Sequence, residues 1–96
     1  MSWINNEPPK LSKDIELPKE FLDVVKVLEM GAKKYGANSW LKGEHFDSKS
    51  NHESMFRHLS KSLCCKDKDS ESDLDHLLHL ACRALMEYTL RRRDEH

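Results

Sequence analysis

The stretch from residue 74 to residue 92 constrains the fold most, because its apolar residues recur at intervals of three and four. That interval lines one face of an α-helix. Ser72 and Asp75 resemble a helix start, and the terminal RRRDEH is predicted to fray into solvent. The sequence therefore predicts a long third helix whose buried stripe consists of Leu74, Leu77, Leu78, Ala81, Cys82, Leu85 and Tyr88.

Two further stretches carry the same helical spacing. A first helix is predicted from Pro18, a residue favoured at the first helical position, to the residue before Gly36. A second is predicted from Ser50, which with Glu53 forms a capping box, to about Cys65. Their predicted buried residues are Phe21, Val24, Val25, Leu28, Ala32 and Tyr35 in the first helix, and Met55, Phe56, Leu59 and Leu63 in the second.

No segment alternates apolar and polar residues for long enough to propose a strand. The expected fold is therefore all-α, a small bundle of about three helices over residues 18–92. Residues 1–17 contain Pro8 and Pro9 without any apolar period and are predicted to form an extended N-terminal arm, while residues 93–96 form a C-terminal tail. A domain of 96 residues buries a marginal core, so we expect it to self-associate into a homo-oligomer.

The composition excludes several classes of protein. A net charge of −1 lacks the basic excess that captures extended DNA or RNA, so any anion site must be local. No run of about 18 apolar residues and no cationic leader occurs, which predicts neither a membrane span nor a signal peptide. The three cysteines, Cys64, Cys65 and Cys82, match no zinc or disulfide spacing. We expect reduced thiols and a cytoplasmic protein that does not bind membranes.

One group of side chains is suited to binding phosphate. His76, His79 and Arg83 share a side of the third helix, and Arg57 and His58 lie on the second. If these helices are antiparallel neighbours, the five side chains converge on one polar pocket. Imidazole and guanidinium groups donate hydrogen bonds to phosphate oxygens, so the pocket would favour a phosphorylated ligand.

Two alternatives stand beside that interpretation. Asp69 and Glu71, in the segment before the third helix, are candidate ligands for a metal ion, with His76 and His79 as further donors. The histidines also fit ordinary structural roles, near the helix start or paired with a carboxylate.

A second candidate region is GAKKYGANSW, residues 31–40. Lys33 and Lys34 supply positive charge, Tyr35 and Trp40 supply flat surfaces that can stack on a base, and Asn38 supplies an amide. These are the parts of a nucleotide site. The alternative is that the aromatic residues fill the core while the lysines project into water.

Three separated motifs resemble those of a family found largely in phages, the dATP/dGTP diphosphohydrolase N-terminal domain. They are GAKKYG with a following tryptophan, RHL, and a DxES segment that leads into HLxH, where Asp73 replaces the usual glycine. The resemblance covers about residues 18–90. The residues that match its pattern are Gly31, Lys33, Lys34, Tyr35, Gly36, Trp40, Arg57, His58, Asp69, Glu71, Ser72, His76 and His79.

The resemblance implies helical architecture, a nucleotide ligand and magnesium-assisted release of pyrophosphate. Related all-α nucleotide pyrophosphohydrolases hold Mg²⁺ with paired carboxylates on helices, since hard cations need several oxygen ligands. Here Glu20 and Asp23 form the only such pair within a predicted helix, at its first turn, and Glu44 and Asp47 repeat the spacing in a loop.

The leading prediction is thus a phage-type nucleotide-binding protein that sequesters a signalling nucleotide, as an anti-defence sponge does in an infected host cell, with no certain cofactor. The first alternative is a Mg²⁺-dependent dATP/dGTP pyrophosphohydrolase. The second is a protein-interaction module. The sequence leaves the identity of the nucleotide open.

Overall fold

The computed structural model of the chain describes residues 14–44, 46–65 and 67–94. Within these ranges the chain forms two short 3₁₀ segments, η2 (Lys19–Asp23) and η3 (Ser39–Lys42), and three α-helices. The α-helices are α1 (Val24–Tyr35), α2 (Ser48–Cys64) and α3 (His76–Asp94). The described residues include no strand beyond one isolated bridge between Lys68 and Asp75. The predicted all-α bundle of three helices is confirmed.

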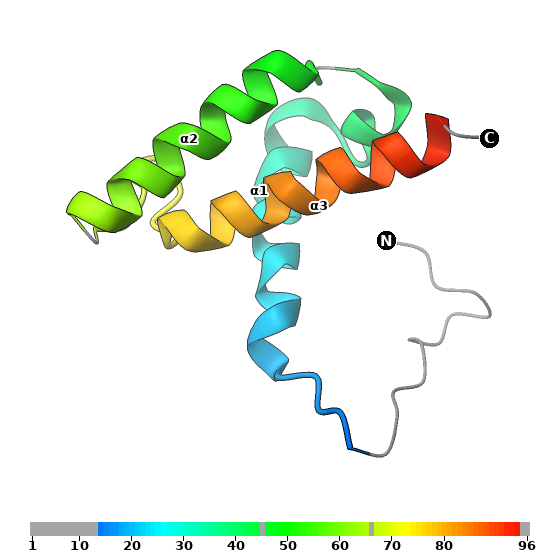
Figure 1. The fold of residues 1–96 in the computed structure, drawn as a ribbon. Helices are drawn as coiled ribbons and strands as arrows, with labels where there is room; N and C mark the ends of the chain where they lie inside the picture. The colour runs from blue at the N-terminus through cyan, green and yellow to red at the C-terminus, as the bar shows by residue number, and fades with distance from the viewer. Residues whose placement is uncertain (1–13, 45, 66, 95–96) are drawn as a thin grey trace.

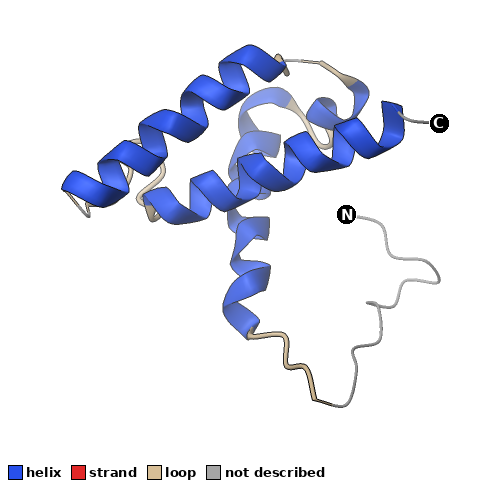
Figure 2. Cartoon of the chain, in the orientation of Figure 1, coloured by secondary structure: helices blue, strands red, loops and turns tan. Residues whose placement is uncertain are grey.

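The helices α2 and α3 lie side by side and run in opposite directions (Figure 1). Helix α1 crosses this pair and packs against α3 (Figure 2). The connection between α2 and α3 folds back on itself, because the amide of Asp69 donates to the carbonyl of Leu74 at 2.9 Å. The antiparallel packing places the inward face of α2 along α3 from His76 to Glu87.

The helix starts differ from the sequence predictions. Helix α2 begins at Ser48, because the carboxylate of Asp47 accepts the amide of Ser50 at 2.9 Å. Asp47 is therefore the N-cap, and the predicted capping box that starts at Ser50 is wrong. Pro18 precedes a 3₁₀ turn instead of opening an α-helix. Helix α3 begins at His76, with Asp75 accepting the amide of Leu77 at 2.8 Å.

The contact between α2 and α3 is polar. Asn51 donates through its side-chain nitrogen to a carboxylate oxygen of Glu87 and to the carbonyl of Arg83, both at 3.1 Å. The hydroxyl of Ser48 donates to the other oxygen of Glu87 at 2.8 Å. Buried polar groups are tolerated when their hydrogen bonds are made, and these are made. The buried polar side chains of the two helices are Asn51, Ser54, His58, His76, His79 and Glu87.

The predicted apolar stripes of α2 and α3 are accordingly wrong at most positions. Only Cys82 of the α3 stripe is fully buried. The side of α3 that faces α2 carries hydrogen-bonded polar side chains instead of the predicted stripe. Helix α1 buries Val27, a residue outside its predicted stripe. The predicted core residues that are instead exposed are Phe21, Val25, Tyr35, Phe56, Leu59, Leu63, Leu77, Ala81, Leu85 and Tyr88.

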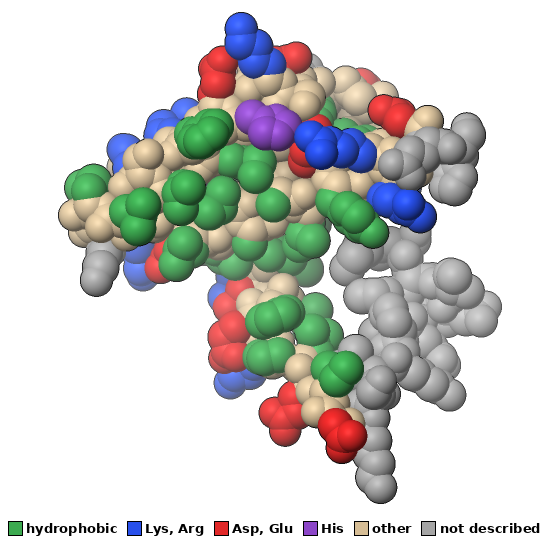
Figure 3. Space-filling model, viewed as in Figure 1, with side chains coloured by type: hydrophobic (Ala, Val, Ile, Leu, Met, Phe, Trp, Pro, Cys, Tyr) green, Lys and Arg blue, Asp and Glu red, His purple; other side chains and the backbone are tan. Residues whose placement is uncertain are grey.

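Apolar side chains are exposed on the outer surface of the helical pair. Hydrophobic side chains are spread over α2 and α3 in the space-filling view (Figure 3). Phe56 and Leu63 are 69% and 74% exposed, and Leu77 and Tyr88 are 55% and 63% exposed. The pair therefore presents its polar face inward and much of its apolar surface outward.

Most of the predicted N-terminal arm lies outside the described residues. Residues 15–18 form neither helix nor strand, and Ile15 and Leu17 are exposed. At the other end α3 continues to Asp94, two residues beyond its predicted end. Within the ranges described, no helix has the length and apolar character needed to cross a membrane.

Candidate functional site

A cavity of about 160 Å³ lies where α1, η3, α2, the α2–α3 connection and α3 meet. Its walls combine both candidate groups of the sequence, the 31–40 segment and the arginine and histidine group. Its lining residues are Val27, Leu28, Met30, Gly31, Ala32, Lys34, Tyr35, Asn38, Ser39, Trp40, Glu44, Phe46, Arg57, His58, Asp69, Glu71, His79, Cys82, Arg83 and Met86.

The turn after α1 brings Trp40 to this cavity. Gly36 ends the helix with φ +97°, and its amide bonds to the carbonyl of Ala32 at 2.9 Å. Asn38 then takes a left-handed conformation, φ +61°, before η3. Asparagine tolerates this conformation better than most residues. The two positive φ values reverse the chain, so that Asn38 and Trp40 line the same cavity as Tyr35.

Two arginines reach the cavity from different helices. Arg83 of α3 donates to the side-chain oxygen of Asn51 at 3.1 Å, and its buried Nε makes no hydrogen bond within the described part of the chain. Arg57 of α2 donates to the hydroxyl of Ser54 at 3.2 Å. Among the described residues neither guanidinium has a carboxylate within 4 Å. Burial, followed by the neighbouring Arg57, lowers the pKa of Arg83.

The carboxylates of the cavity are partly engaged. Glu71 forms an ion pair with Lys34 Nζ. Asp69 accepts the backbone amide of Ser72 at 3.0 Å and the hydroxyl of Ser72 at 3.1 Å. Burial opposes ionisation of Asp69, but these hydrogen bonds outweigh it and the pKa of this carboxyl is lowered. Asp69 is therefore a fixed negative charge at the edge of the site.

Three histidines are packed together beside Asp69. His58 and His76 share a hydrogen bond between their Nδ1 atoms at 2.9 Å, and His79 Nε2 lies 2.6 Å from the hydroxyl of Ser72. Burial, followed by the neighbouring His79 and Arg57, lowers the pKa of His58 from 6.5 to about 4. Burial also lowers the pKa of His79. The imidazole of His58 is therefore neutral at physiological pH, with a nitrogen lone pair available.

A second, apolar cavity of about 340 Å³ adjoins the first. The two share Asn38 and Trp40 from the turn, and Cys82 and Met86 from α3. Cys82 is fully buried, and burial raises the pKa of its thiol to about 11. Trp40 and Cys82 thus form part of a wall between a polar cavity and an apolar one.

The structure places most, but not all, of the predicted site residues at the first cavity. Lys34, Tyr35, Asn38 and Trp40 line it from the 31–40 segment, whereas Lys33 is exposed and does not. His76 is buried behind the cavity wall and faces His58 instead. The other predicted residues that line it are Arg57, His58, Asp69, Glu71, His79 and Arg83.

The lining residues that were not predicted as site residues include Met86, Glu44 and Phe46. Met86 lies at i+3 from Arg83 and i+7 from His79, so their shared helix face was the signal for it. Glu44 and Phe46 lie in the loop before α2, and their place depends on the turn at Gly36 and Asn38. Glu44 was noted only for its spacing to Asp47, and no local pattern in the sequence places either residue at the cavity.

The helices and the cavity define a small all-α protein whose site combines arginine, histidine, aromatic and carboxylate side chains. The family model described as "dATP/dGTP diphosphohydrolase, N-terminal" matches residues 5–96. The chain belongs to this family, as its motifs indicated. Comparison with curated proteins and with solved structures gives no match.

Proposed function

We propose that this protein binds a phosphate-bearing nucleotide in the cavity, with the phosphate held by Arg57 and Arg83. The observation that carries the proposal is the pair of guanidinium groups without a carboxylate partner among the described residues. Two cations lining one small cavity repel each other, and a bound anion relieves that repulsion. Arginine also matches the geometry of phosphate oxygens.

The remainder of a nucleotide fits the other side of the site. About 160 Å³ is less than the roughly 300 to 1,000 Å³ of a typical small-molecule site, so the first cavity accommodates only part of the ligand. Trp40 borders both cavities, and Tyr35 and Asn38 lie beside it. An aromatic ring and an amide at this boundary suit stacking on a base and hydrogen bonding to its edge.

Two observations favour holding the nucleotide over cleaving it. Magnesium-assisted cleavage needs several carboxylate oxygens near the phosphates. In the described part of the cavity Glu71 is paired with Lys34, and the one cluster with three potential ligands contains two imidazoles and a single carboxylate. Asp23 pairs with Lys26 and Asp47 caps α2, away from the cavity lining. The three carboxylates that line the cavity, Glu44, Asp69 and Glu71, do not gather into one cluster of oxygen ligands among the described residues, which favours holding the nucleotide.

We therefore propose sequestration, the mode of an anti-defence sponge that withdraws a signalling nucleotide from a host. The dATP/dGTP pyrophosphohydrolase activity named by the family is the second candidate. It is supported by the family membership and by the presence of Asp69 and Glu71 in the same cavity as the arginines.

The deciding experiment incubates the full chain with dATP, dGTP, ATP, GTP and cyclic nucleotides, with and without Mg²⁺. Mass spectrometry then identifies the bound and free products. Sequestration predicts that the bound nucleotide is recovered unchanged under both conditions. Conversion to a monophosphate and pyrophosphate in Mg²⁺ would establish the hydrolase instead, and absence of both bound nucleotide and conversion would reject both.

Arginine variants locate the site. Arg57→Gln and Arg83→Gln should each weaken nucleotide affinity by about tenfold or more, since a hydrogen bond to a charged group contributes roughly 1.5 to 3 kcal/mol. Arg91→Gln removes an exposed guanidinium from the same helix as Arg83 and should leave the affinity unchanged. Isothermal titration calorimetry measures all three. Equal losses in the Arg83 and Arg91 variants would place the ligand elsewhere.

A further inference from the structure

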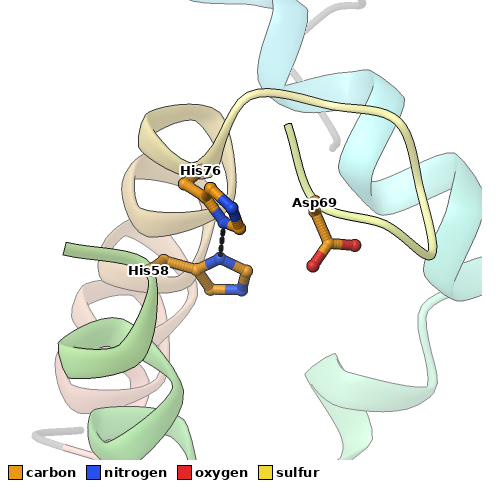
Figure 4. A group of neighbouring side chains, drawn as sticks. All are labelled: His58, Asp69 and His76. Atoms are coloured by element: carbon orange, nitrogen blue, oxygen red, sulfur yellow. Dashed lines mark hydrogen bonds between the residues drawn. The ribbon is translucent and has the colours of Figure 1, made fainter. Parts of the chain in front are cut away.

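Three side chains from different elements face one another at the back of the cavity (Figure 4). His58 comes from α2, Asp69 from the α2–α3 connection and His76 from the start of α3. One potential ligand atom from each lies within 4.8 Å of the others. We propose that His58, Asp69 and His76 form a binding site for a divalent transition-metal ion of the Zn²⁺ class.

The two imidazoles are already held at a spacing close to that of ligands on one ion. Their Nδ1 atoms are 2.9 Å apart, and each side chain is only 2% exposed. Zinc binds histidine nitrogen at about 2.0 to 2.1 Å, so two nitrogens on one tetrahedral ion lie a little over 3 Å apart. Small ring rotations are sufficient to admit an ion between them, and Asp69 points toward the ring of His58 from the opposite loop.

The other nitrogen of His76 is a second indication. His76 Nε2 is buried and makes no hydrogen bond to any described residue, although a carboxylate oxygen of Asp67 lies 3.4 Å away. In the metal-free protein one Nδ1 must carry the proton that joins the two rings. If both Nδ1 atoms bind a metal ion, each ring carries its proton on Nε2. The Nε2–H group of His76 can then donate a hydrogen bond to the carboxylate of Asp67. A carboxylate that orients a metal-bound histidine in this way is a common arrangement.

The donor types select the kind of ion. Imidazole nitrogen suits zinc, copper, nickel and iron, whereas Mg²⁺ and Ca²⁺ take oxygen ligands. A histidine ligates a metal ion through the neutral form of its imidazole. Ser72 fixes Asp69 through two hydrogen bonds, which limits the rearrangement that binding needs. Three protein ligands leave one position open, and two of them, His58 and Asp69, line the nucleotide cavity.

The proposed metal site does not require nucleotide binding, so it can be tested with the metal alone. The full chain, stripped with a chelator, is titrated with Zn²⁺ in the absence of nucleotide. The exposed Cys64 and Cys65 are competing zinc ligands, so the titration uses the Cys64→Ser, Cys65→Ser protein. We expect one Zn²⁺ per chain, and a parallel titration with Mg²⁺ should show binding at least a hundredfold weaker.

Two variants test the proposed ligands, and a third is a matched control. Asp69→Asn and His58→Gln should each weaken Zn²⁺ affinity by at least about tenfold. His52→Gln removes a partly exposed imidazole from the same helix as His58 and should leave the affinity unchanged. Circular dichroism checks that each variant retains its helices.

A measurement without substitutions covers the case in which a buried variant fails to fold. Nitrogen-15 spectra of the imidazoles should show that Zn²⁺ shifts Nδ1 of both His58 and His76, with a proton on Nε2 of each. The proposal is overturned if the serine-substituted protein binds no Zn²⁺, or if Zn²⁺ shifts the signals of His52 and leaves His58 and His76 in place. Loss of nucleotide binding in the Arg83 variant with Zn²⁺ binding intact would separate the two proposals.

Discussion

The imidazole rings of His58 and His79 are stacked, with centroids 4.6 Å apart and planes 5° from parallel. Burial is the main cost of charging either ring, and repulsion from His79 adds to that cost for His58. The pKa of His58 is lowered to about 4 and that of His79 is also lowered. We therefore expect the free energy of unfolding to fall in acid.

The first prediction concerns stability against pH. The unfolded chain binds more protons than the folded chain between about pH 6.5 and pH 4, so the free energy of unfolding falls as the pH falls through that range. From pH 7.5 to pH 5 the loss through His58 alone is about 2 kcal/mol. Urea denaturation at a series of pH values measures it. His58→Gln should reduce the slope and His52→Gln should not; equal slopes in all three proteins would contradict the prediction.

The second prediction concerns Trp40. Because its indole borders both cavities, we expect a bound purine nucleotide to quench its fluorescence by stacking. The chain has two tryptophans, so a Trp3→Phe background makes Trp40 the only one. Trp40→Ala should weaken nucleotide affinity by about five- to a hundredfold, since stacking on one base contributes roughly 1 to 3 kcal/mol. Unchanged fluorescence at saturating nucleotide would place the base away from Trp40.

The third prediction concerns the polar contact between α2 and α3. Asn51→Ala removes three hydrogen bonds between the two helices, one to Glu87 and two to Arg83. We expect the free energy of unfolding to fall by about 1 to 3 kcal/mol. Glu53→Ala, an exposed position on the same helix, is the matched control and should change it by less than about 0.5 kcal/mol. Chemical denaturation of both variants makes the comparison.

The fourth prediction concerns self-association. Contiguous apolar surface on a small domain marks an interaction site, and the exposed face of α2 and α3 carries Phe56 and Leu63. We expect a second copy to cover this face. Sedimentation analysis should show a homo-oligomer that Phe56→Glu with Leu63→Glu converts to a monomer, while Lys49→Glu, also exposed on α2, has no effect. A wild-type monomer at micromolar concentration would refute it.

The sequence was sufficient to predict three helices and the motifs of the family, because helical periodicity and capping are local properties. It was not sufficient to predict which faces those helices bury. Leu77 and Tyr88 lie on the more apolar side of α3, yet His76 and Glu87 are inside because Asn51, Ser48 and His58 supply their partners. A pairing between residues more than 15 positions apart leaves no periodic signal.

The cavity likewise combines features that the sequence could predict with features that it could not. The groups on α3 share a face through simple spacing, so their proximity to one another could be predicted. Only the folded chain distinguishes Lys34, which lines the cavity and pairs with Glu71, from its neighbour Lys33. The start of α2 was misplaced because Asp47 and Ser50 are both favourable caps, and the choice between them depends on the path of the preceding loop.

The buried thiol of Cys82 can be used to measure local opening of the structure. Thiolates are the species that alkylating reagents attack, and a buried thiol with a pKa of about 11 forms almost none at neutral pH. Cys64 and Cys65 are exposed and would be labelled from the native state. The rate at which Cys82 is labelled, once the other two are replaced by serine, therefore measures how often α3 separates from its neighbours, and a ligand that fills the adjoining cavities would slow it.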